Sequence, residues 1–180
     1  MLYRVILLLL LCPSVYGQIF NAAPFQGVGN TGIALKSIYS VTNNAAGLAG
    51  LLRPEVAIAY QPNFISSSIS TQALFIALPF QADNVIGVGM RRYGVAGVSS
   101  LLTASGAYAR AFGSVFSTSL SINYHTFSVL NYGKDHVFSV DLGLQLSLLE
   151  TLSLGAVLRN ISKEMFADDI DQYIPREVGV

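Results

Sequence analysis

A strict alternation of apolar and small or polar residues between His136 and Leu148 constrains the fold of this chain more than any other feature. One set of alternating positions is apolar: Phe138, Val140, Leu142, Leu144, Leu146 and Leu148. The positions between them are mostly small or polar: Val137, Ser139, Asp141, Gly143, Gln145 and Ser147. Successive side chains point to opposite faces of a β-strand, so this segment predicts a long strand with one apolar face.

The same alternation, less sharp toward the N-terminus, recurs in six other segments. They are residues 56–61, 74–80, 86–91, 102–109, 116–125 and 152–159. The longer ones approach the roughly 9–11 residues that a tilted strand needs to cross a membrane, whereas strands of soluble proteins average about 5–6. The pattern therefore predicts about seven or eight consecutive antiparallel strands.

Short and long connections are expected to alternate between these strands. Short turns are predicted at 81–84, 113–115 and 149–151, and longer loops at 93–100, 127–135 and 161–173. Outer-membrane barrels have short periplasmic turns and longer extracellular loops, so we expect the turns at Gly113 and Glu150 to face the periplasm and 131–134 to face outward. Aromatic residues near the predicted strand ends are typical of the girdles of such barrels: Tyr60, Phe80, Phe112, Phe116, Tyr124, Phe127 and Phe138.

Composition points to the same environment. Hydrophobic residues make up 52% of the chain and charged residues 11%, against about 25% charged in soluble domains. The mean hydropathy is +0.54, yet no run approaches the roughly 20 apolar residues of a membrane-spanning helix. Lipid admits only helices and closed barrels, because every backbone polar group must be satisfied internally. We therefore predict an all-β fold, an antiparallel up-and-down membrane β-barrel that is partial in this chain.

The N-terminus has the three parts of a cleavable signal peptide over residues 1–17. Arg4 supplies the positive charge, residues 5–11 the apolar core, and 15–17 the cleavage site, so that the mature chain begins at Gln18. A single membrane anchor, or a lipoprotein modified at Cys12, are the alternatives. Export and the barrel pattern together predict the cell outer membrane. Cleavage would remove the chain's one cysteine.

Residues 18–53 differ from the rest. They are rich in glycine and lack sustained alternation, and 44–52 is expected to form a short helix. We interpret this region as a plug or lead-in to barrel strands in 54–180. Residues 27–32 match the dinucleotide pattern G-x-G-x-x-G, but no strand precedes and no helix pattern follows it, so tight packing inside the barrel is the preferred interpretation.

Nothing in the chain indicates catalysis. His125 and His136 are the only histidines, and they and the carboxylates lack the spacing of a metal site or a nucleophile constellation. No enzyme activity, cofactor or metal is therefore expected. The ten basic residues balance the ten acidic ones without forming a block, so nucleic acid is not an expected partner.

A three-residue turn at 149–151 would place Leu148 opposite Leu152 and keep all apolar residues on one face. Leu142, Leu144, Leu146, Leu154 and Leu158 would then contact lipid, and Ser119, Ser121, Gly143 and Gly155 would face the interior. The residues expected to face the lumen are Asn123, His125, Asp141, Gln145 and Arg159. The same register places Asp141 opposite Arg159, which predicts an ion pair that fixes the wall or anchors the plug. The alternative is that both charges meet water in an open channel.

Several short motifs resemble the N-terminal signature of FadL-like and PorV/PorQ-like outer-membrane proteins. The first is the glycine-rich stretch 27–34, followed by Asn-Asn-Ala-Ala-Gly-Leu-Ala at 43–49, where Ala45 stands at the position in which proline is commonest. The segments 154–161 and 174–180 resemble later strands of these proteins. Seven residues carry the plug motif: Gly27, Gly29, Gly32, Asn43, Asn44, Gly47 and Leu48.

The resemblance implies a barrel of about fourteen strands with an N-terminal plug. It also implies either import of small hydrophobic molecules or a structural or shuttle role in a type IX secretion system. Because the chain stops at Val180 inside an apparent strand, a truncated member is expected. The expected partners are the lipid bilayer and either hydrophobic small molecules or secretion-system proteins. A soluble exported β-protein is the third alternative.

Overall fold

The structure is a computed structural model that describes residues 22–27, 32–63, 68–95, 97–149, 152–163, 166 and 177–179. Eight strands form a single antiparallel sheet in which each strand pairs with its neighbours in sequence. They are β1 (Glu55–Pro62), β2 (Ser70–Phe80), β3 (Asn84–Val95), β4 (Ser99–Phe112), β5 (Phe116–Val129), β6 (Gly133–Leu149), β7 (Leu152–Arg159) and β8 (Glu177–Gly179). The predicted all-β, up-and-down fold is confirmed.

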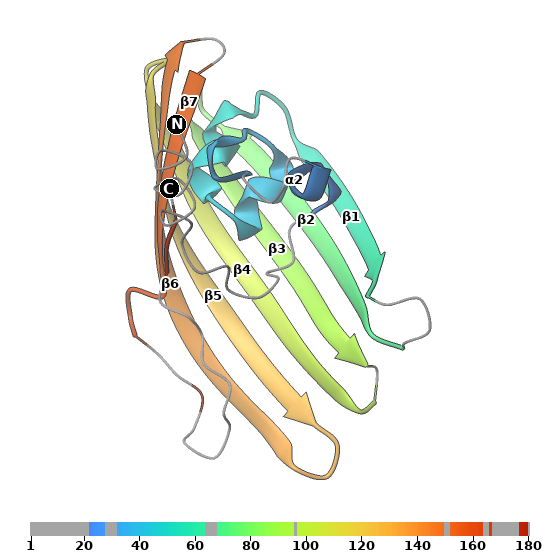
Figure 1. The fold of residues 1–180 in the computed structure, drawn as a ribbon. Helices are drawn as coiled ribbons and strands as arrows, with labels where there is room; N and C mark the ends of the chain where they lie inside the picture. Colours follow the sequence, from blue (N-terminus) through green and yellow to red (C-terminus); the bar gives the residue numbers. More distant parts are fainter. Residues whose placement is uncertain are drawn as a thin grey trace, which may run out of the picture.

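The sheet curves and does not close on itself. Figure 1 shows it bending around the N-terminal part of the chain, which lies within the curve. Among the described residues β1 and β8 are the two edges, each paired with one neighbour only. This open, curved sheet is consistent with part of a barrel.

The two faces of the sheet differ as the alternation predicted. On the outer face, large apolar side chains are exposed on successive strands: Val56, Ile58, Leu74, Leu78, Ile86, Val88, Met90, Leu120, Ile122, Leu142, Leu144, Leu146, Leu154 and Leu158. On the inner face, Ser119, Ser121 and Gly143 are buried. The registers of β4 with β5 and of β5 with β6 keep inner residues opposite inner residues throughout.

The N-terminal segment, which we define as residues 22–27 and 32–53, covers part of the inner face (Figure 1). It consists of the short helix α2 (Ala23–Gly27) and three 3₁₀ helices, η1 (Gly32–Ala34), η2 (Ile38–Thr42) and η3 (Ala45–Gly50). The η3 helix is the short helix predicted over 44–52. Asn44 caps it, because its side chain accepts a hydrogen bond from the Ala46 amide.

Two of the predicted long loops are wrong. Strand β3 continues to Val95 and β4 begins at Ser99. In the same way, β5 continues to Val129 and β6 begins at Gly133. These connections are therefore as short as the turns at the other end of the sheet, where 81–83 and 113–115 lie. Glycines and charged residues such as Gly94, Gly133 and Lys134 interrupt the apolar alternation in these stretches, so the pattern did not show that the strands continue. At the same end of the sheet as these two connections, the connections 63–69 and 160–176 remain longer than any turn at the opposite end, so loop length supports the predicted orientation only in part.

Several predictions fall outside the described residues. They include the signal peptide over 1–17, Gly29, the turn residue Glu150, and most of the loop 161–173. Within the described part of the chain, no helix is both long and apolar enough to cross a membrane.

Candidate functional site

The N-terminal segment rests on β2 to β4 through an apolar contact that we call the anchor. Leu48 is fully buried there with Ile38 and Val41 of the same segment, against Phe75 and Ala107 of the sheet. Aromatic rings extend this contact. Tyr39 meets the Phe75 ring edge-on, with 5.6 Å between centroids, and Phe25 stands edge-on to Tyr39 in turn. Ring pairs of this geometry add to the stabilisation from burial alone.

Glycines let the backbone of the N-terminal segment approach the sheet closely. A Cβ at Gly87 would lie 2.6 Å from Leu48 Cδ1, and one at Gly155 would lie 2.5 Å from the Ile33 carbonyl oxygen. A Cβ at Gly143 would collide with the side chains of Asn44 and Ser119. These contacts explain why small residues occupy the inner positions of β3, β6 and β7.

On β5 to β7 the same segment is held by hydrogen bonds, and we call this contact the seam. The Asn44 Nδ2 group donates to the carbonyl of Leu144 at 2.8 Å and to that of Ile33 at 2.9 Å. The Ser117 hydroxyl donates to the Ala46 carbonyl at 3.0 Å. Gln145 Nε2 donates to the carbonyl of Ala34. Each bond joins a side chain to a main-chain carbonyl, so hydrogen bonds fix the segment on β5 and β6, whereas on β7 Ile33 packs closely against Gly155.

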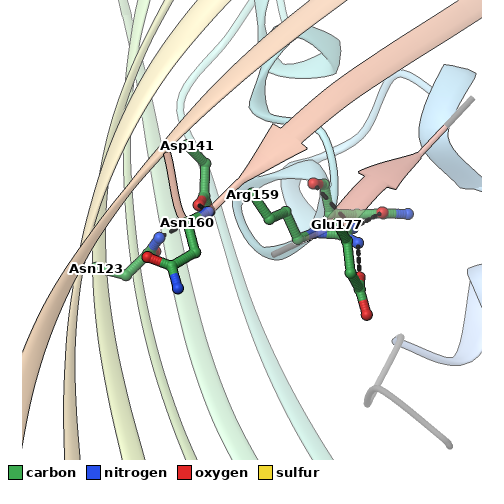
Figure 2. Close-up of polar contacts among 6 residues, drawn as sticks. Asn123, Asp141, Arg159, Asn160 and Glu177 are labelled. Carbon is green, nitrogen blue, oxygen red and sulfur yellow. Dashed lines mark hydrogen bonds and ion pairs between the residues drawn. The ribbon is translucent and has the colours of Figure 1, made fainter. Parts of the chain in front are cut away.

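The predicted ion pair between Asp141 and Arg159 is wrong. Arg159 Nη1 lies 2.9 Å from Glu177 Oε2, and Arg159 Nη2 donates to Asn43 Oδ1 at 2.8 Å. Figure 2 shows Arg159 turned toward Glu177 and away from Asp141. The physical reason is the register, because Glu177 of β8 lies directly opposite Arg159. Arg159 thus links the sheet to the N-terminal segment, one of the two roles suggested for the predicted pair.

Asp141 has partners of its own. One carboxylate oxygen accepts from Asn123 Nδ2 and the other from the Asn160 main-chain amide, both at 2.8 Å (Figure 2). Asn160 adopts a left-handed conformation with φ of 50°, which asparagine tolerates better than most residues. This turn carries the chain off β7 and brings its amide to the carboxylate.

A chain of side-chain hydrogen bonds continues across the inner face from Asp141. Asn123 Nδ2 also lies 3.4 Å from Ser139 Oγ, which lies 2.9 Å from His125 Nε2. The other ring nitrogen of His125 lies 3.1 Å from Thr103 Oγ1. The chain therefore connects β4, β5 and β6. Ser139 is only 2% exposed, so its contact with His125 bridges two strands rather than facing a substrate.

The structure brings together most of the residues proposed from the sequence. Asn123, His125, Asp141, Gln145 and Arg159 all lie on the inner face. Of the motif residues, Gly32, Asn43, Asn44, Gly47 and Leu48 are buried in the N-terminal segment, whereas Gly27 is exposed at the end of α2. Phe127, proposed for an aromatic girdle, instead lies beside Phe166, with 6.2 Å between ring centroids.

Three residues of this site were missed. Glu177 pairs with Arg159, and Ser117 donates to the Ala46 carbonyl. Thr103 contacts the ring of His125. The alternation of 116–125 placed Ser117 on the inner face, but nothing in the sequence indicated that it meets the N-terminal segment. In the described part of the chain no three histidine, cysteine or carboxylate side chains gather as a metal site would require. Comparisons with protein-family models, curated proteins and solved structures find no match.

Proposed function

We propose that this chain forms the wall of an outer-membrane β-barrel and that its N-terminal segment is the plug of that barrel. The observation that carries the proposal is the outer face, where large apolar side chains stay exposed on all the long strands. Soluble monomers rarely expose an apolar patch of more than a few hundred Å². A face of this extent is suited to lipid.

The height of the apolar face matches a bilayer. On β6 it runs from Leu148 to Phe138, ten residues apart, which at about 3.4 Å per residue spans roughly 34 Å along the strand. A strand tilted by about 40° would cover roughly 26 Å of membrane thickness, close to the apolar band of about 25 Å on known barrels.

Aromatic and polar residues border this face at both ends. At the end with the turn 113–115, the rings of Phe112 and Phe116 lie 5.6 Å apart. At the other end, Tyr124 lies 4.8 Å from the Phe138 ring and stacks on His136 at 5.7 Å. Beyond Tyr124 the outer face turns polar, since Ser128 pairs with Lys134. Such borders are typical of the membrane interfaces of barrels.

Passage of molecules through the plugged barrel is the function we favour. The inner face carries buried polar groups in place of the uniform apolar core of a soluble sandwich, which favours a lumen over the soluble alternative. A role as a type IX secretion subunit, and membership in the FadL-like or PorV/PorQ-like family, stay predictions. A lumen requires the open edges of β1 and β8 to be paired, either by further strands or by other copies of this chain.

The proposal is tested by folding the purified full chain into lipid vesicles. Flotation with the vesicles, together with protection of the strands from added protease, would support a spanning sheet. Recovery of the whole protein in the unbound fraction, with a stable fold in buffer, would contradict it and favour the soluble exported protein.

Orientation needs a separate experiment on intact cells. In a Cys12→Ala background, Ser114→Cys marks one end of the sheet and Tyr132→Cys the other, and both positions are exposed. We expect an impermeant thiol reagent to label position 132 and to spare position 114. Labelling of 114 alone would reverse the predicted topology.

A further inference from the structure

The sheet residues beneath the N-terminal segment differ in polarity between the anchor and the seam. At the anchor, the inner side chains of β2 to β4 are apolar and closely packed: Ala73, Phe75, Ala77, Val85, Ala107 and Ala109. At the seam, most inner positions of β5 and β6 carry polar side chains and form a polar stripe, with Phe127, Val137 and Gly143 as exceptions. We define the polar stripe as Ser117, Ser119, Ser121, Asn123 and His125 of β5 with Ser139, Asp141, Gln145 and Ser147 of β6.

Within the described part of the chain, three buried polar atoms at the seam have no hydrogen-bond partner. They are Asn43 Nδ2, Ser119 Oγ and Gln145 Oε1, on residues that are 6%, 4% and 1% exposed. An unsatisfied buried polar group is destabilising, so native proteins normally supply a partner or an ordered water. One atom donates, one accepts and the hydroxyl can do either, which is the set that water or another small hydroxylated molecule satisfies.

A pocket opens onto one end of this stripe. It has a volume of about 240 Å³ and lies beside the turn 113–115. Ser117 and Ser147 of the polar stripe line it, together with Lys36 and Gly50 of the N-terminal segment. The pocket therefore leads from solvent at the end of the sheet to the residues that begin the seam.

Two of the charged groups at the seam already have partners. Arg159 pairs with Glu177, and Asp141 accepts two hydrogen bonds from Asn123 and Asn160. The described part of the seam combines charges of both signs with amides and hydroxyls, unlike the single-sign rings that select ions in channels. Uncharged molecules that exchange hydrogen bonds fit this lining better than ions or apolar molecules do.

We propose that the seam is the hydrated path through this barrel, along which water and small uncharged hydroxylated molecules pass between the N-terminal segment and β5 to β7, while the anchor stays closed. The path begins at the pocket near Ser117, passes the three unpartnered atoms, and continues along the polar stripe to Asn123 and His125. The inference rests on the proposed barrel, because only a closed wall makes the inner face a lumen. It assigns the passing molecule a chemical class opposite to the hydrophobic one expected from the sequence.

Thiol accessibility tests the seam without reference to a membrane. In the full chain with Cys12→Ala, Ser119→Cys is compared with Ala107→Cys and Ala73→Cys, all folded in detergent. In the structure Ser119 is 4% exposed, Ala107 5% and Ala73 7%. Burial alone would therefore make position 119, at the seam, the slowest to react. We expect a small water-soluble thiol reagent to modify position 119 at least ~10-fold faster than the other two, because water reaches it by local opening. Equal rates, or faster reaction at 73 or 107, would overturn the inference.

Permeability tests the passage itself. Asn44→Ala removes the bonds to Leu144 and Ile33 and should loosen the seam, whereas Val41→Ala removes apolar contact at the anchor. Vesicles with Asn44→Ala should swell faster than wild type in glycerol or erythritol, and Val41→Ala should not increase swelling. Faster swelling with Val41→Ala alone would refute the path along the seam. Failure of the wild-type chain to insert would count against the proposed barrel, and the thiol rates would then decide on the seam independently.

Discussion

The outer and inner faces of this sheet reverse the usual arrangement of a water-soluble sheet. Outside, Leu144 is 45% exposed between equally exposed leucines, whereas inside, Ser119 and Gln145 are almost completely buried. The outer face is uniform and makes no specific contact, while the inner face consists of particular hydrogen bonds and close approaches. The difference teaches that the outer face tolerates any apolar side chain, whereas the inner face depends on the identity of individual residues.

The largest effect is expected from a charge at the centre of the outer face. Leu144→Arg should cost about 2–4 kcal/mol of folding free energy in a bilayer, because a guanidinium near the midplane loses its hydration. Leu149→Arg, next to the turn, should cost only about 0–1 kcal/mol. The folded fraction in vesicles, measured by heat-modifiable migration on gels, would report both. Equal losses for the two variants would contradict a membrane-embedded outer face.

Replacing a glycine by valine should destabilise the protein on the inner face but not on the outer face. Gly87→Val would place a Cβ 2.6 Å from Leu48 Cδ1 and 2.8 Å from Val41 Cγ2, which should cost about 1–3 kcal/mol through overpacking. Gly106→Val is the matched control, because a Cβ at Gly106 on the outer face would meet nothing within 4 Å. The free energy of unfolding from urea titration should fall for Gly87→Val only. A comparable fall in both variants would mean that the N-terminal segment does not rest on β3.

Arginines on opposite faces should respond differently to loss of charge. Arg159→Met removes the contacts to Glu177 and Asn43 and should lower the free energy of unfolding by about 1–2 kcal/mol, a range discounted because both charged side chains are about a fifth exposed. Arg92→Met, at an exposed outer position, should change it by less than about 0.5 kcal/mol. A double-mutant cycle with Glu177→Gln isolates the pair. A coupling energy of zero would rule out the ion pair.

The smallest effect is expected at the aromatic border. The Tyr108 hydroxyl donates to Asn84 Oδ1 at 2.5 Å on the outer surface, so Tyr108→Phe should cost about 0.5 kcal/mol. Tyr132→Phe, at a hairpin tip and 90% exposed, should be neutral. Thermal unfolding of the two variants, compared in the same detergent, provides the measurement. A higher unfolding temperature for Tyr108→Phe would show that the Tyr108 hydroxyl does not stabilise the protein.

The faces and the central register were predictable from the sequence because a strand has a period of two residues. The register that was predicted to bring Asp141 opposite Arg159 also places Gln145 opposite Gly155 and Gly143 opposite Val157, and the structure has both pairs. Near the turn the register differs, since Leu149 and not Leu148 lies opposite Leu152. An irregularity between Ser147 and Leu149 absorbs one residue, and such bulges leave no trace in an alternation pattern.

The partners within the site were not predictable in the same way. Alternation placed Asp141 and Arg159 on one face. Whether they pair with each other or with other groups depends on the path of the chain after β7. The left-handed turn at Asn160 and the pairing of Glu177 with Arg159 decide that competition. Neither follows from periodicity, because one is a single-residue conformation and the other joins strands separated by a long connection.

The contacts of the N-terminal segment also bear on the order in which the molecule assembles. Each strand pairs with the next along the chain, so the sheet can grow hairpin by hairpin over short connections as far as β7. The bonds from Asn44 to Leu144 and from Asn43 to Arg159 instead close loops of 100 and 116 residues. Such closures carry a larger entropic cost and need β6 and β7 to be in place. The N-terminal segment precedes the strands in the sequence, yet it is thus among the last parts of the described chain to reach its final position.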